Sequence, residues 1–177
     1  LNQGARAFSE MGDVTFRLEK LREEANRQIQ LNDAMFNFQK GMDDLALAGE
    51  QQTDPEALRS EFAQKSADLV DAGRGAILDP IAKMAFEEKA LAVHESQRIR
   101  TETKAVGLLQ ERVRASNDAR ADQLVNSAAF ETDPVLRQSM IDEAVGLFHG
   151  PAYTAEQSEE KRQAITRKVD YASALAM

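Results

Sequence analysis

The histidines are the first candidates for chemistry, because imidazole acts as a metal ligand and as a general base near neutral pH. His94 and Glu95 are adjacent in a segment with helical spacing, as in an H-E-x-x-H zinc motif. Arg98 stands where that motif needs its second histidine, so no zinc pair forms. His149 precedes Gly150 at an expected helix end, where an exposed histidine is usual. With no cysteine in the chain either, we expect no metal ligand and no catalytic histidine or thiol.

Paired carboxylates are the next candidates. A glycosidase holds two carboxylates across a cleft with separated pKa values, whereas adjacent helix positions point about 100° apart. We therefore interpret the pairs as solvated helix faces, and an enzyme that works through paired carboxylates is the third alternative for the function. The pairs are Glu23-Glu24, Asp43-Asp44, Glu87-Glu88 and Glu159-Glu160.

Phosphate recognition is disfavoured by both motif and charge. The only glycine-rich step, Gly73-Arg74-Gly75, lacks both phosphate-loop patterns and follows no strand, so we interpret it as a turn between helices. The formal charge of −8 repels nucleic-acid backbones, and the basic residues over 98–120 are interleaved with acidic residues. The sequence therefore predicts no cofactor, no small-molecule substrate and no nucleic-acid partner.

The elements that carry these residues are helices, whose beginnings are marked by proline. All but one of the prolines directly follow aspartate, which caps a first turn while proline has no donor to lose there. The remaining proline precedes a capping box that begins at Thr154. The predicted capping residues are Asp54, Asp79, Asp133 and Thr154.

Apolar spacing between these marks predicts an all-α fold: an elongated bundle of long amphipathic helices with shorter helices. We expect a first helix over about 13–47, a second that ends near Gly73, and one continuous helix from Pro80 to Phe130. The latter would be about 75 Å long, with its weak point at Gly107. No apolar run is long enough to span a bilayer, and the first residues lack the pattern of a secretion signal.

The long helix carries a heptad series in two runs: Met84 with Leu91 and then, after a step of eight, Ile99, Val106 and Val113. Heptad spacing implies a partner helix, and the other expected helices are too short to cover the whole stripe. We therefore predict that Ile99, Val106 and Val113 contact another chain.

The Q-T-D-P and E-T-D-P tetrads are each followed by a similar apolar series. We interpret this as a weak tandem repeat of helical units, about 13–88 and 89–177, that share the long helix. Chance similarity of amphipathic helices is the alternative. Residues 1–12 are expected to be a flexible or frayed segment before one helical domain, 13–177. The chain begins without Met and stops within an expected helix, so we expect it to be part of a longer polypeptide.

A family resemblance rests on N-D-A-M-F-N-F-Q-K-G-M-D-D-L, T-D-P-E-A-L-R-S-E-F, and T-D-P-V-L-R-Q-S-M-I-D-E-A-V followed by G-P-A-Y-T-A-E-Q and K-V-D-Y-A. The likeness extends over most of residues 18–172. Their order resembles a helical region of phage and prophage virion proteins of the internal or tail-associated ejection type. The resemblance implies a non-enzymatic scaffold that assembles with itself or other virion proteins, in the virion or the bacterial cytoplasm. The alternative is a helical sensor or adaptor module in bacterial signalling.

Overall fold

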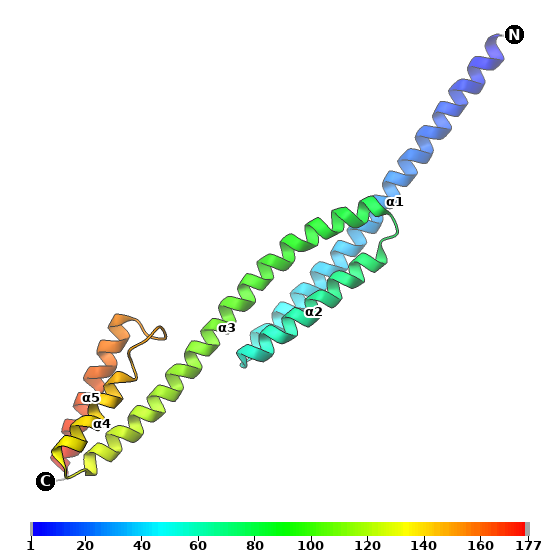
Figure 1. Cartoon of the computed structure of the whole chain (residues 1–177). Coiled ribbons are helices and arrows are strands. Elements are labelled where there is room, and N and C mark those ends of the chain that lie inside the picture. Colours follow the sequence, from blue (N-terminus) through cyan, green and yellow to red (C-terminus); the bar gives the residue numbers. More distant parts are fainter. Residues whose placement is uncertain (1, 176–177) are drawn as a thin grey trace. The chain divides into compact units, whose positions relative to one another are not determined.

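The computed structural model describes the backbone of residues 2–175 and the side chains of residues 14–171. This part of the chain contains five helices and no strand, which confirms the all-α prediction (Figure 1). The helices are α1 (Asn2–Gln51), α2 (Pro55–Ala76), α3 (Pro80–Phe130), α4 (Pro134–Gly146) and α5 (Ala155–Leu175). Contacts divide the chain into two compact units, residues 1–105 (unit 1) and 106–177 (unit 2).

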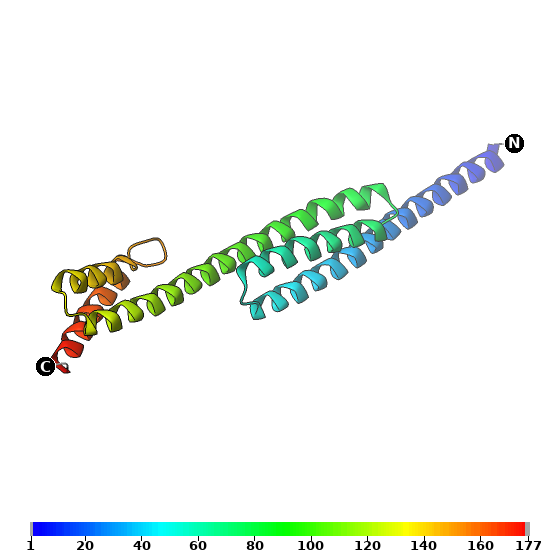
Figure 2. The same cartoon turned by 60° about the horizontal axis from the view of Figure 1, so that its bottom comes forward.

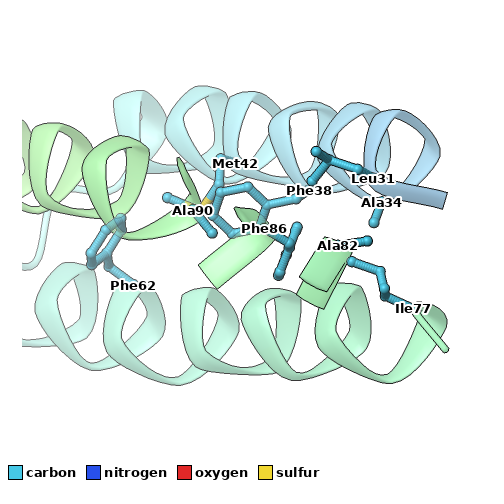
Figure 3. Close-up of a cluster of buried hydrophobic side chains, with 9 residues drawn as sticks. All are labelled: Leu31, Ala34, Phe38, Met42, Phe62, Ile77, Ala82, Phe86 and Ala90. Atoms are coloured by element: carbon cyan, nitrogen blue, oxygen red, sulfur yellow. The ribbon is translucent and has the colours of Figure 1, made fainter. Parts of the chain in front are cut away.

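Unit 1 is a three-helix bundle in which α1, α2 and the first part of α3 lie side by side, as two views agree (Figures 1 and 2). All three helices contribute to its core (Figure 3). The rings of Phe38 and Phe86 meet edge to face at its centre, with centroids 5.7 Å apart and an interplanar angle of 83°. The core residues are Leu31, Ala34, Phe38, Met42, Phe62, Ile77, Ala82, Phe86 and Ala90.

Unit 2 joins the last part of α3 to α4, α5 and the connection between them. Its buried cluster draws on all of these elements. Ion pairs of Lys161 with Asp118 (2.5 Å) and Lys168 with Asp122 (2.6 Å) link α5 to α3 beside that cluster. Their side chains are two-fifths or more exposed, so each pair contributes well below about 1 kcal/mol. The cluster consists of Ala121, Leu124, Val125, Ala144, Phe148, Ile165 and Val169.

The long helix is confirmed: α3 runs from Pro80 to Phe130 and passes through Gly107 without a break. Helix α1 is longer than the predicted 13–47 at both ends. The predicted flexible segment 1–12 includes Leu1, which lies outside the described residues, as do all side chains up to Asp13. The predicted tandem repeat also stays a prediction, and the contacts divide the chain within α3 after Ala105.

The prediction of a turn at Gly73-Arg74-Gly75 is wrong. Helix α2 continues to Ala76, and the connection to α3 follows it. Gly73 is buried, and a side chain at this position would collide with the ring of Phe86 from α3. The glycine is therefore required for the close approach of two helices rather than for a change of chain direction.

None of the helices over residues 2–175 combines the length and the apolar character that a membrane span requires.

Candidate functional site

The aspartates of the Asp-Pro steps accept hydrogen bonds from the first turns of the helices that follow them. Asp54 Oδ1 accepts from the backbone N–H groups of Glu56 at 2.9 Å and Ala57 at 3.4 Å. Asp133 Oδ1 does the same for the residues two and three positions on, at 2.8 and 3.3 Å. Both aspartates have extended backbone angles, as helix-capping residues do.

Asp79 has the same role at the start of α3 and also pairs with an arginine side chain. Its Oδ1 accepts from the N–H groups of Ile81 and Ala82, each at 2.9 Å, and from Arg27 Nε of α1 at 3.0 Å. The hydrogen bond from Ala82 N–H is the largest effect on the pKa of Asp79 and lowers it. Desolvation raises the pKa but only partly offsets this effect, and the Arg27 guanidinium and Ile81 N–H lower the pKa further. These contacts therefore favour the ionised carboxylate of Asp79 at the connection between α2 and α3.

The first residue of each T-D-P tetrad has a role that the sequence did not predict. Gln52 Oε1 accepts from the backbone N–H of Asp54 at 3.1 Å, and Glu131 Oε1 accepts from that of Asp133 at 2.9 Å. At the remaining Asp-Pro step, Asp79-Pro80, a residue from a distant part of the chain has this role. Gln30 Oε1 of α1 accepts from the backbone N–H of Asp79 at 3.2 Å. In each tetrad the first residue therefore fixes the chain before the helix, and the aspartate caps the first turn of the helix. The motif thus has a structural role.

Thr154 begins α5 with a reciprocal pair of hydrogen bonds. The N–H of Gln157 donates to Thr154 Oγ1 at 3.2 Å, and the N–H of Thr154 donates to Gln157 Oε1 at 3.0 Å. This is the capping-box geometry. The four capping positions thus belong to the starts of four different helices.

The structure brings one nucleophile-type residue to a histidine. Ser66 Oγ of α2 lies 3.1 Å from His94 Nε2 of α3. Ser66 is fully buried, so its hydroxyl is closed to a substrate, and the ring of His94 faces Phe62 with centroids 5.6 Å apart. A nucleophile needs access to the reacting carbon as well as a base. We interpret the pair as a hydrogen bond that satisfies a buried hydroxyl between α2 and α3.

The carboxylates of residues 14–171 do not form a metal cluster either. No group of three or more His, Asp or Glu side chains with a metal-binding arrangement occurs in this part of the chain. The pKa of Glu159 is lowered by the hydrogen bonds of Gln163 and Arg162 on the same helix. Such a shift suits a paired surface carboxylate, whereas a general acid needs a raised pKa.

An apolar groove in unit 2 is the best candidate for a site. Val106, Leu109 and Val113 of α3 form one side, and the connection between α4 and α5 forms the other. The groove has a volume of about 330 Å³, and its lining contains no Lys, Arg, Asp or Glu. The connection contributes Leu147, His149, Gly150, Pro151, Ala152 and Tyr153, and α3 adds Gln110 and Asn117.

Two hydrogen bonds hold the connection against α3. Arg114 Nε donates to the carbonyl oxygen of Ala152 at 2.6 Å, and Asn117 Nδ2 donates to that of Leu147 at 2.7 Å. Gly150 has a φ of +156°, the one positive value among the described residues, and this angle favours glycine. The wall of the groove is therefore built by specific contacts.

Tyr153 anchors the same wall. Its ring meets Phe148 edge to face at 5.3 Å, and the Arg114 guanidinium lies 5.8 Å from its centroid. Its hydroxyl is buried without a protein hydrogen-bond partner among the described residues. Sequence reasoning did not find Tyr153, because the role depends on how the connection folds back onto α3.

Two of the three predicted partner contacts, Val106 and Val113, line this groove and are 44% and 40% exposed. Ile99 is 60% exposed and belongs to unit 1, outside the groove lining. The earlier members of the heptad series, Met84 and Leu91, are exposed as well. The heptad stripe is therefore distinct from the buried face of α3 in unit 1.

Comparisons with known proteins assign no family to this chain. No family model matches it, and neither a curated protein nor a solved structure does.

Proposed function

We propose that this chain is a non-enzymatic assembly segment that acts through helix–helix contacts and that its groove in unit 2 receives a helix of another copy or another virion protein. The observation that carries the proposal is the exposed apolar line of Val106, Leu109 and Val113 facing a wall fixed by Arg114 and Asn117. Grooves of this kind bind an amphipathic helix through side chains spaced three and four residues apart.

The chemistry of the lining supports a helix over a charged ligand. A phosphate or carboxylate site needs cations or converging N–H groups, whereas this lining carries no charged side chain. The lining also includes the polar side chains of Gln110, Asn117 and His149. A mainly apolar surface with a few polar groups is usual for a protein-binding site.

Light scattering across a concentration series tests self-assembly through the groove. We expect the average mass of the wild type to rise with concentration. Val106→Glu should weaken the association by at least about tenfold, because the contact would desolvate an unpaired charge. Leu91→Glu is the matched control: it adds the same charge to α3 at an exposed position outside the groove lining.

The two variants decide the outcome. A Val106→Glu curve that falls below both the wild type and Leu91→Glu supports the groove as the contact. A wild type that stays monomeric, or three coincident curves, would overturn self-assembly through this surface.

The virion setting follows from the resemblance of the helical segments and T-D-P tetrads. Neighbouring genes test it directly. Capsid, portal or tail genes beside the coding sequence agree with the virion interpretation, whereas a kinase or receptor gene favours the sensor or adaptor alternative.

A further inference from the structure

The first part of α1 is a helix without cover within unit 1. It extends beyond the connection between α2 and α3 in both views (Figures 1 and 2). Every residue from Val14 to Asn26 is exposed, whereas burial on α1 begins near Leu31. Because an isolated helix of this length is marginal in water, its apolar side chains need another surface.

The apolar residues of this segment form a second stripe on α1. Val14, Leu18, Leu21 and Ala25 recur at steps of four, three and four, the spacing of a coiled-coil seam. Val14, Leu18 and Leu21 are each more than half exposed. The buried face of α1 in unit 1 uses other positions, such as Phe38. The stripe is therefore not a continuation of the bundle core.

Charges beside the stripe distinguish parallel from antiparallel pairing of two copies. In heptad terms, Arg17 and Glu24 flank one edge, and Arg22 flanks the other. A parallel, in-register pair of two copies would bring Arg17 of each copy to Arg22 of the other, which is repulsive. An antiparallel pair places Arg17 of each copy beside Glu24 of the other, so both flanking contacts attract.

We propose that residues 14–25 of α1 form an antiparallel helix pair with the same segment of a second copy. The layers of this pair combine Leu18 of one copy with Leu21 of the other, and Val14 with Ala25. The interface is isologous and closes at the dimer, since each copy presents the same patch to its partner. It is separate from the groove of unit 2 and uses different residues.

Charge exchange tests the pair, with every variant placed in a Val106→Glu background so that the groove does not contribute. We expect Arg17→Glu and Glu24→Arg each to weaken dimerisation by roughly tenfold, because each turns both attractive contacts into repulsive ones. The double variant should recover to within roughly threefold of its background. Sedimentation equilibrium measures all three.

Matched controls separate this effect from net charge. Lys20→Glu and Glu23→Arg make the same charge changes on the same helix but away from the stripe, and they should leave dimerisation unchanged. A double variant that stays as weak as its single parents, or controls that weaken the dimer equally, would overturn the antiparallel pair. A background chain that stays monomeric would overturn it as well.

Cross-linking gives a second readout, because the chain contains no cysteine of its own. Antiparallel pairing predicts a disulfide when Val14→Cys chains are mixed with Ala25→Cys chains. Neither chain should cross-link alone, since equal positions lie roughly 16 Å apart along the helix axis. A disulfide between two Val14→Cys chains would mean parallel pairing and would contradict the proposal.

Discussion

Gly73 of α2 lies directly against the ring of Phe86 of α3, so that even a methyl group at position 73 would overlap the aromatic carbons. We predict that Gly73→Ala lowers the free energy of unfolding by about 1–3 kcal/mol, because the well-packed core must shift to admit it. Urea denaturation followed by circular dichroism measures this change.

Gly107→Ala provides the matched control for that substitution. A side chain at position 107 meets open space inside α3. There the substitution should raise the free energy of unfolding by up to about 1 kcal/mol, because alanine has the higher helix propensity. If both variants shift stability in the same direction, the contact of Gly73 with Phe86 is not the determining feature.

The helix starts at Asp54 and Asp133 should each contribute about 1 kcal/mol to stability through capping. Asp54→Ala and Asp133→Ala remove the acceptor, whereas the corresponding asparagine variants retain one and should lose much less. Chemical denaturation of the four variants checks this prediction. Unchanged midpoints in the alanine variants would show that these hydrogen bonds are not stabilising.

The tyrosines allow the two caps to be followed separately. Tyr153 and Tyr171 are the only tyrosines, the chain has no tryptophan, and both lie in unit 2. Tyrosine fluorescence therefore reports on the unit that contains Asp133. We expect Asp133→Ala to shift the fluorescence transition, and Asp54→Ala to shift the circular dichroism transition, to which both units contribute, with a smaller change in fluorescence.

The connection between α2 and α3 should make stability depend on pH. Hydrogen bonds from Ala82 N–H and Arg27 lower the folded-state pKa of Asp79 below its ordinary 3.8. A depressed carboxylate pKa stabilises the fold above the unfolded value, and this contribution is lost as pH falls through the folded value. The melting temperature of the wild type should therefore fall below about pH 4.

Asp79→Asn tests the origin of that dependence. The amide oxygen still accepts hydrogen bonds but carries no charge toward Arg27. The difference in melting temperature between wild type and variant should be larger at pH 6 than at pH 3. A difference that stays constant over this range would assign the acid response to other carboxylates.

Local sequence chemistry predicted the helix starts, because an aspartate and a proline act within one turn of where they stand. Gly73 was misassigned because glycine serves turns and close helix contacts alike, and only the position of Phe86 distinguishes the two uses. The buried face of α3 in unit 1 was missed for a related reason. Ala82 and Ala90 give a weak apolar signal, while the exposed Met84 and Leu91 give a strong one.

The candidate site was predictable only in part. Val106 and Val113 stood out through heptad spacing. The opposite wall depends on long-range hydrogen bonds from Arg114 and Asn117 to carbonyl oxygens, and no local pattern encodes those. The same holds for Gln30, which reaches the helix start at Asp79 from a distant part of α1.

The absence of charged side chains from the groove lining gives the two proposed contacts opposite responses to ionic strength. An apolar contact is maintained or strengthened when salt is added, whereas exposed charge pairs such as those of Arg17 with Glu24 are screened over about 10 Å at 0.1 M. Salt would therefore favour association through unit 2 over pairing through α1. The ionic conditions of the surroundings would then select which contact forms.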